Sequence, residues 1–470
     1  MTHTSKSPIY DLAIIGAGSG GMAAARRAAE AGMRVVLFEA AHAGGTCVNA
    51  GCVPKKLMVH ASRMADHAEE MPTLGWRTED MTFDWPTLRD AVAGEVERLS
   101  TYHTNRLENL GIALIPERAT ITSPTSVAVA SGPTFEAANI LIATGARPAM
   151  PDLPGSAFCV TSDDIFKLDA LPERLAIIGG GYIAVEFACM MQRFGVAVTV
   201  FERGERLIAP FDAEISALLL EAMAAQGIDI RLCASVDTIL REGDGYVLDG
   251  ENVAGSGTFG RVLMAAGRAP NTLDMGLGEM GVDLTERGHI VVDKEGRSNV
   301  PTIFAAGDVS ERIALTPVAV RGGRRVVDIL AGAAAPLEMQ AVVPTAAFTT
   351  PECASGGLAE AEAESLGKRF TVRRTSFSPL ASLLQDDPGS VFIKCLVENE
   401  TGLLLGFHFF GPAASEAAQL GAVTLSAGLT ESQLHNTMAL HPSVAEEVIS
   451  LGRADEPIHQ KVARRARAAA

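Results

Sequence analysis

The sequence predicts an α/β protein with two copies of one parallel-sheet unit and a separate C-terminal α+β domain. Apolar runs alternate with helical patterns from Asp11 to about Leu207, which is typical of parallel sheets. Within that region a strand–glycine turn–helix–strand unit occurs twice. After about Val342 the pattern changes to successive strands followed by helices, which indicates a domain of another kind.

The first copy of the unit begins with the apolar run Asp11–Ile15 and the turn Gly16-Ala17-Gly18-Ser19-Gly20-Gly21. A helical pattern, the apolar run Arg34–Phe38 and Glu39 follow. The first glycine permits a tight turn, the second lets a pyrophosphate approach the backbone, and Gly21 lets the helix pack closely on the strand. The helix N-terminus then faces the phosphates, and Glu39 is placed to bind a ribose diol.

The second copy repeats this order with the apolar run Leu175–Ile178, the turn Gly179-Gly180-Gly181-Tyr182-Ile183-Ala184, the strand Ala197–Phe201 and Glu202. In both copies the acidic residue lies 23 positions after the first glycine. The sequence therefore predicts two Rossmann-like dinucleotide-binding domains. Two such sites imply electron transfer between two cofactors, with FAD at the first copy and a nicotinamide nucleotide at the second.

The rest of the chain completes three predicted regions. Ile142–Gly145 and Phe304–Asp308 are strands that end in glycine and so suit close approach by a ligand. Further strands are expected at Phe370–Ser376, Val391–Glu398 and Gly402–Phe410. The expected boundaries give an FAD-binding domain over residues 1–154 and 281–340, an NAD(P)-binding domain over 155–280, and a C-terminal domain over 341–470.

Composition narrows the function classes. The 470 residues are 47% hydrophobic and 20% charged, which fits a globular enzyme and excludes a disordered or fibrous chain. A net charge of −17 argues against nucleic-acid and anionic-membrane partners.

No apolar run approaches the ~18 residues of a membrane helix, and Met1–Tyr10 lacks the features of a signal or transit peptide, so a cytoplasmic enzyme is expected. The basic end (Lys461, Arg464, Arg465 and Arg467) is expected to be a solvated tail, with docking as the alternative.

Cys47 and Cys52 stand apart from five scattered cysteines. An odd, sparse set of cysteines is not a disulfide framework, and no second Cys/His pair lies at zinc-ligand spacing, so no metal is expected. The pair follows the Gly44-Gly45-Thr46 turn and can close a small disulfide on the first turn of a helix. Gly51, the helix N-terminus and nearby Lys55 favour a low thiolate pKa, and such a pair can hold two electrons as a dithiol.

The segment Gly44–Lys56 resembles the redox motif of the pyridine nucleotide–disulfide oxidoreductases in its glutathione reductase form, and the likeness runs from Asp11 to about Gly452. The resemblance implies a homodimer in which residues 341–470 form the interface. It implies that Cys52 is the thiolate beside FAD, that Cys47 attacks the substrate disulfide, and that Lys55 pairs with Glu186 on the flavin side. Together the glycine motifs and the resemblance predict these dinucleotide-binding residues: Gly16, Gly18, Ser19, Gly21, Glu39, Thr46, Lys55, Thr144, Gly145, Gly179, Gly181, Tyr182, Ala184, Glu202, Arg203, Gly267, Arg268, Asp308 and Thr316.

The C-terminal segment His441-Pro442-Ser443-Val444-Ala445-Glu446-Glu447 resembles the acid–base segment of the same family. Histidine suits this work because its pKa lies near neutrality. The resemblance implies that His441 acts across the dimer interface as proton donor, that Glu446 orients it, and that Glu447 contacts substrate. His408 and His435 lack such a motif and are expected to be structural.

Three features favour glutathione disulfide as substrate. Ser19, Arg26 and Arg324 match glutathione-binding positions of the family, and arginine suits the substrate's carboxylates. No second redox motif follows at the C-terminus. A departure is His103, which stands where these enzymes place a tyrosine, so a modified glutathione stays an alternative. A dihydrolipoamide dehydrogenase is disfavoured, and a binding flavoprotein with secondary redox activity is the alternative of another class.

The coenzyme signals conflict. The turn Gly179-x-Gly181-x-x-Ala184 resembles the NADPH type, and Arg203 matches a residue that binds the 2′-phosphate, with Arg206 close by. Glu202, however, is typical of NADH binding and would repel that phosphate. The resemblance favours NADPH, while NADH or the use of both stays open.

Overall fold

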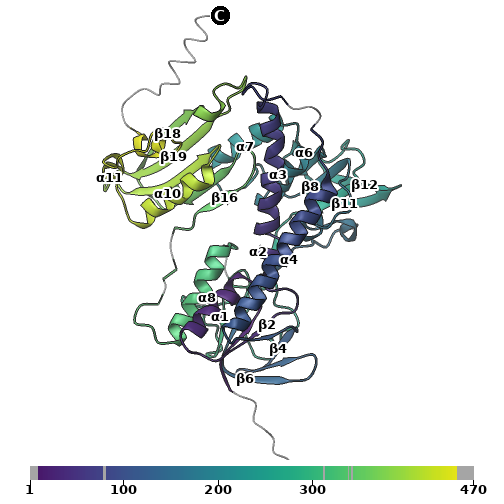
Figure 1. The fold of residues 1–470 in the computed structure, drawn as a ribbon, viewed down its shortest axis with the longest axis vertical. Helices are drawn as coiled ribbons and strands as arrows, with labels where there is room; N and C mark the ends of the chain where they lie inside the picture. Colours follow the sequence, from purple (N-terminus) through teal and green to yellow (C-terminus); the bar gives the residue numbers. More distant parts are fainter. Residues whose placement is uncertain (1–8, 78–80, 311–312, 337, 340–341, 453–470) are drawn as a thin grey trace, which may run out of the picture.

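The computed structural model describes residues 9–77, 81–310, 313–336, 338–339 and 342–452, and it confirms the predicted α/β class (Figure 1). The basic tail lies outside these residues. Within the described ranges no helix is long and apolar enough to span a bilayer. Figure 1 shows the first sheet and its helices at the lower end, the second unit at the right and the C-terminal sheet at the upper left.

The first sheet is parallel in the order β3-β2-β1-β6-β15, and two antiparallel strands, β5 and β4, continue from β6. Its centre forms because Leu12, Ala13 and Ile14 of β1 are fully buried, as expected for a strand covered on both faces. The strands are β1 (Tyr10–Ile15), β2 (Val35–Phe38), β3 (Ala113–Ile115), β4 (Ala119–Ser123), β5 (Ser126–Val129), β6 (Thr134–Ile142) and β15 (Ile303–Ala305).

Helices α1 (Ser19–Glu30) and α8 (Thr316–Leu330) pack against each other beside this sheet (Figure 1). Their backbones approach so closely that a Cβ on Gly323 would lie 2.3 Å from the Gly20 carbonyl oxygen. Side chains on the exposed sides of both helices therefore share one surface.

The second unit repeats the first with the parallel order β10-β9-β8-β13. Helix α6 (Tyr182–Arg193) is buried along most of its length. The remaining elements are α5 (Ser162–Ile165), β8 (Arg174–Ile178), β9 (Ala197–Phe201), α7 (Ala213–Ala225), β10 (Asp229–Arg231), the hairpin β11 (Ser235–Glu242) and β12 (Gly245–Glu251), and β13 (Arg261–Met264). Strands β7 (Ala146–Pro148) and β14 (Arg268–Pro270) pair where the chain passes between the two units.

The C-terminal domain is an antiparallel sheet in the order β16-β17-β20-β19-β18, covered by helix α10. This confirms the predicted α+β domain. Its elements are β16 (Thr345–Ala347), β17 (Cys353–Gly357), α9 (Glu360–Ser365), β18 (Phe370–Phe377), β19 (Val391–Glu398), β20 (Leu404–Phe410), α10 (Ala414–Ser426), α11 (Glu431–His435) and α12 (Glu446–Ser450).

Three helices connect these regions. The short helix α2 (Gly45–Asn49) precedes α3 (Cys52–Glu70), which packs against both α4 (Trp85–Asn109) and α6 of the second unit. Figure 1 shows α3 and α4 running from the first unit towards the other two. The junction of α2 and α3 therefore holds the two cysteines between the nucleotide units.

Candidate active site

A cavity of about 810 Å³ lies between the two nucleotide units. It brings together predicted residues that are far apart in sequence. The predicted residues lining it are Gly16, Gly18, Ser19, Glu39, Thr46, Cys47, Cys52, Lys55, Thr144, Gly145, Tyr182, Glu186, Arg268, Asp308 and Thr316.

The glycine turn at one end of this cavity has the geometry that a dinucleotide needs. Gly16 has a φ of 104°, and a Cβ there would lie 2.5 Å from the Ala143 carbonyl oxygen. A Cβ on Gly21 would lie 1.8 Å from the Gly16 oxygen, whereas the Cβ position of Gly18 meets nothing closer than 3.8 Å. Glu39 accepts hydrogen bonds from the Ala17 and Ala41 amides at 2.7 and 2.8 Å. The backbone is thus open where a pyrophosphate would approach, and an acid stands beside it, so these residues fit FAD.

The cysteine pair is present as two free thiols at the cavity wall. Cys52 is the first residue of α3, and its sulfur lies 3.6 Å from the Thr316 hydroxyl. A hydrogen bond from Cys47 lowers the pKa of Cys52 to about 6 against the effect of burial, with help from Thr316 and Lys55. The same hydrogen bond, together with burial, raises the pKa of Cys47. The pair therefore ionises first at Cys52.

A buried ion pair lines the same cavity as the glycine turn. Lys55 Nζ is 2.8 Å from Glu186 Oε1, and Glu186 is only 3% exposed. The same Glu186 oxygen accepts from the Phe348 amide at 2.8 Å, and Lys55 Nζ lies 4.2 Å from the Phe348 ring centroid. The ammonium is thus held in one place by α6 and by the segment between β16 and β17.

Tyr182, Arg268 and Asp308 line the same cavity. Tyr182 is the first residue of α6 and is 38% exposed. Arg268 Nε lies 3.8 Å from Asp308 Oδ2. Burial raises the pKa of Asp308 and of Tyr182, and in both cases the Arg268 charge opposes it. The N-terminus of α6, which belongs to the second nucleotide unit, therefore forms part of the wall of the large cavity.

A smaller cavity of about 390 Å³ lies at the second glycine turn. Gly179 repeats Gly16, because its φ is 115° and a Cβ there would lie 2.5 Å from the Ala265 oxygen. Ala184 is fully buried, as the third position of the turn requires. The cavity is lined by Gly180, Gly181, Glu202, Gly204, Glu205, Arg206, Ala209 and Pro210.

The charged residues of the smaller cavity differ in part from the predicted set. Glu202 lines it and accepts from the Gly204 amide at 2.6 Å. Arg206 lines it too, whereas Arg203 and Gly267 do not, although both arginines are exposed. Arg206 donates to the Ala209 carbonyl at 2.8 Å. The sequence placed Arg206 only near the site, because position along a loop does not show which of two arginines borders the cavity.

A basic patch, which we call the arginine cluster (Arg26, His103, Arg106 and Arg324), lies where α1, α4 and α8 meet. Burial lowers the pKa of Arg26, and the charges of Arg106 and Arg324 lower it further. Burial also lowers the pKa of His103, together with the charges of Arg26 and Arg106. These groups are therefore near enough to repel one another, and an anion would relieve that repulsion.

Arg106 is the member of this cluster that sequence reasoning missed. Its Nη1 donates to the Tyr102 hydroxyl at 3.0 Å, and the Tyr102 and His103 rings lie 5.5 Å apart. The signal was present, because Arg106 follows Tyr102 by four residues and so shares its helix face.

His441 and Glu446 form the expected pair. His441 Nδ1 lies 2.9 Å from Glu446 Oε2 and 3.1 Å from Oε1, so Nδ1 carries the proton and Nε2 is left to act. The Ser443 amide also donates to Glu446, at 3.3 Å. The His441 side chain is 78% exposed, and neither it, Glu446 nor Glu447 lines the large cavity of its own chain.

Comparison with known proteins defines the class. Residues 10–323 match the model of the pyridine nucleotide-disulphide oxidoreductases, and residues 343–451 match the dimerisation domain of the same proteins. The chain belongs to the pyridine nucleotide-disulphide oxidoreductase family, as its cysteine motif predicted. It is a flavin disulfide oxidoreductase that uses FAD and NAD(P)H and forms a homodimer.

Three curated relatives are similar over nearly the whole chain. A glutathione reductase of Burkholderia cepacia is 38% identical over 444 residues, which cover 94% of this chain and 98% of the relative. One of Nostoc sp. is 36% identical over 460 residues, covering 94% and 99%. A chloroplastic/mitochondrial glutathione reductase of Pisum sativum is 35% identical over 453 residues, covering 94% and 82%.

Proposed function

We propose that this protein reduces glutathione disulfide to two glutathione molecules with NAD(P)H, through FAD and the Cys47–Cys52 pair. The observation that carries this proposal is the free thiol pair in the wall of the large cavity. The arginine cluster lies outside that wall and supports the choice of substrate, because Arg26 belongs to α1, whose first residue Ser19 lines the cavity with both cysteines. Glutathione disulfide has several carboxylates, and arginines bind carboxylates through a planar pair of donors. The names of the relatives support the same substrate.

The cysteine chemistry follows from the two unequal thiols. FAD, when bound, supplies the two-electron link between NAD(P)H and the cysteine pair. Cys47 has a raised pKa and needs a base before it can attack, while Cys52 is ready as a thiolate. The Cys47 sulfur attacks one substrate sulfur, the substrate S–S bond breaks, and the first glutathione leaves with a proton. Cys52 then attacks Cys47, the Cys47–Cys52 disulfide forms, and the second glutathione leaves.

The base and proton donor in this scheme is His441 of the partner subunit. Its imidazole is held by Glu446 but faces outward in its own chain, so it cannot serve its own cavity in this arrangement. Residues 343–451 match a dimerisation domain, which supports a role across the interface. The exposed apolar side chains of Met438 (92%) and Leu440 (77%) beside it fit a surface that a second subunit covers.

Within this proposal each nucleotide has its own region. Residues 1–154 and 281–340 would bind FAD, residues 155–280 would bind NAD(P)H, and residues 341–470 would form the interface. Glu39 would bind the ribose of FAD, and Lys55 with Glu186 would fix the charge beside the flavin ring.

For the coenzyme we propose NADPH as the preferred donor, with NADH accepted as well. Arg206 lines the cavity at the second turn and supports a 2′-phosphate, while Glu202 and Glu205 line the same cavity and oppose it. Glu202→Ala should raise the NADPH-to-NADH ratio of kcat/KM by about tenfold, because one opposing carboxylate is removed. A ratio that stays the same would remove Glu202 from coenzyme choice.

The substrate proposal is tested by steady-state turnover with NADPH and NADH on a panel of disulfides. The panel contains glutathione disulfide, a disulfide of glutathione amidated at its carboxylates, and lipoamide. Turnover fastest with glutathione disulfide supports the proposal. Faster turnover of the amidated form would assign His103 and the arginine cluster to a modified glutathione instead, and preference for lipoamide would refute both.

A further inference from the structure

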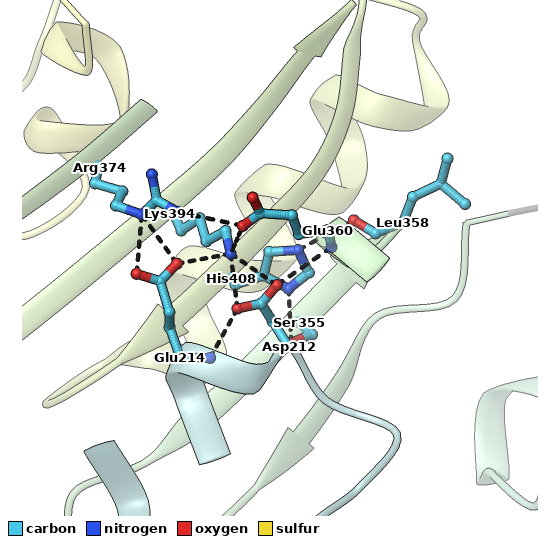
Figure 2. A network of polar contacts seen from close by, with 8 residues as sticks. All are labelled: Asp212, Glu214, Ser355, Leu358, Glu360, Arg374, Lys394 and His408. Atoms are coloured by element: carbon cyan, nitrogen blue, oxygen red, sulfur yellow. Dashed lines mark hydrogen bonds and ion pairs between the residues drawn. The ribbon is translucent and has the colours of Figure 1, made fainter. Parts of the chain in front are cut away.

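A buried lysine joins the coenzyme unit to the dimerisation domain (Figure 2). Lys394 is 1% exposed, and its Nζ lies 2.9 Å from both carboxylate oxygens of Asp212. Nζ also lies 2.7 Å from Glu214 Oε2 and 2.5 Å from Glu360 Oε2. A lysine ammonium has three hydrogens, and here each can meet a carboxylate. A fully buried charge is stable only when it is paired in this way.

The partners come from two domains. Asp212 caps α7 by accepting from the Glu214 amide at 3.1 Å, and both residues belong to the second nucleotide unit. Lys394 lies on β19 and Glu360 begins α9, both in the C-terminal domain. The Glu360 amide also donates to Asp212, at 3.3 Å. The start of α7 is thus held from outside its own unit.

Two neighbours complete the network. Arg374, opposite Lys394 on β18, has its Nε 2.9 Å from each carboxylate oxygen of Glu214. His408, opposite Lys394 on β20, donates from Nε2 to the Leu358 carbonyl at 3.1 Å, and burial lowers its pKa. His408 is therefore neutral, and two cations face three carboxylates (Figure 2). Loss of the Lys394 charge would leave one cation among them.

Residues 202–212, which end at Asp212, contribute most of the lining of the smaller cavity. This segment begins at Glu202, and its Ile208 amide donates to the Gly180 oxygen of the glycine turn at 2.7 Å. Ile208 has a φ of 40°, which a β-branched residue rarely adopts, so surrounding contacts must hold it. The Phe211 amide donates to the Ile208 oxygen at 2.8 Å, and Asp212 follows directly. A continuous path of bonds therefore runs from the glycine turn to Lys394.

We propose that Lys394 is a positioning residue for the nicotinamide coenzyme: from the dimerisation domain it anchors Asp212 and so fixes residues 202–212 around the adenosine end. Lys394 does not touch the coenzyme. The inference rests on the proposed use of the second unit for NAD(P)H, and it assigns to the dimerisation domain a part in coenzyme affinity. If the segment keeps its binding geometry only about a tenth of the time, the apparent Kd rises about tenfold.

The test is calorimetric titration of the purified dimer with NADP⁺ and with NAD⁺. Lys394→Met, which keeps most of the length of the side chain but removes its charge, should raise both Kd values about tenfold. Lys368→Met is the matched control, because Lys368 pairs with Glu398 at 2.9 Å on the surface of the same domain. The control should bind both nucleotides like the wild type.

Equal binding by wild type and Lys394→Met would overturn the proposal, and so would equal loss in Lys368→Met. If Lys394→Met does not fold, Asp212→Asn decides by the same titration, since asparagine can still cap α7. The measurement needs no disulfide substrate. If glutathione disulfide proves not to be the substrate, the titration still tests the role of Lys394. If the wild type binds neither nucleotide, the assignment of the second unit to NAD(P)H is refuted.

Discussion

Removal of the Cys47 thiol should make Cys52 less reactive. The hydrogen bond from Cys47 is the largest cause of the lowered Cys52 pKa, which is about 6. A lowered pKa means that thiolate dominates above that pH, so at pH 7 about 90% of Cys52 is ionised, against about 3% for an ordinary thiol of pKa about 8.5. Cys47→Ala removes the donor, while Lys55 and Thr316 remain. The Cys52 pKa should then rise to about 7.4–8, and the thiolate fraction at pH 7 should fall roughly three- to tenfold.

The assay is alkylation of the pre-reduced protein by iodoacetamide between pH 5 and 9, with Cys52 quantified by peptide mass spectrometry. The rate for the wild type should rise with a midpoint near pH 6. Cys47→Ser is the matched control, because its hydroxyl can still donate, and its midpoint should lie between those of the wild type and Cys47→Ala. Identical midpoints for all three proteins would show that Cys47 does not stabilise the Cys52 thiolate.

Three further outcomes follow from the site. Arg106→Leu should raise the KM for glutathione disulfide about tenfold with little change in kcat, as removal of one carboxylate contact predicts, and unchanged KM would exclude Arg106 from binding. Lys55→Met should lower the free energy of unfolding by about 3 kcal/mol in thermal unfolding, because it leaves the 4%-exposed Glu186 side chain unpaired. The double variant Lys55→Met/Glu186→Gln should recover part of that loss. The His441→Ala and Cys47→Ser proteins, each inactive alone, should regain up to about a quarter of wild-type turnover when they are unfolded and refolded together. The reason is that half of the dimers are then mixed, and each mixed dimer contains one intact site. No recovery would place His441 in the site of its own chain.

Local patterns were enough to predict the fold class and the nucleotide units. The glycine turns, most of the strands and the spacing to Glu39 and Glu202 are set within short stretches, and strands lie within two residues of the runs predicted for the glycine-turn units and the C-terminal domain. The predictions for Ile142–Gly145 and Phe304–Asp308 were wrong in extent, because β6 ends at Ile142 and β15 ends at Ala305, before the glycines. Gly21 illustrates why, because its lack of a side chain is required by the oxygen of Gly16 only five residues away. The resemblance in the cysteine segment then predicted the family, which the comparisons confirm.

Contacts between distant segments were not predictable in the same way. The Lys394–Asp212 pair joins residues 182 positions apart, and no repeat or motif marks either one. Arg106 belongs to the arginine cluster only because α4 packs against α1, and the place of Arg206 beside the smaller cavity depends on a loop conformation. Side-chain direction on loops and between domains is set by tertiary packing, which a single sequence leaves open.

The most direct test of the proposed reaction is to count the thiols that it releases. Under anaerobic conditions, the FAD-loaded dimer is mixed with limiting NADPH and excess glutathione disulfide, and free glutathione is measured against NADPH consumed. We expect two glutathione molecules per NADPH, and none above background for Cys47→Ser or Cys52→Ser. NADPH oxidation without release of glutathione, or release that survives loss of Cys47, would contradict the claim that this cysteine pair reduces glutathione disulfide.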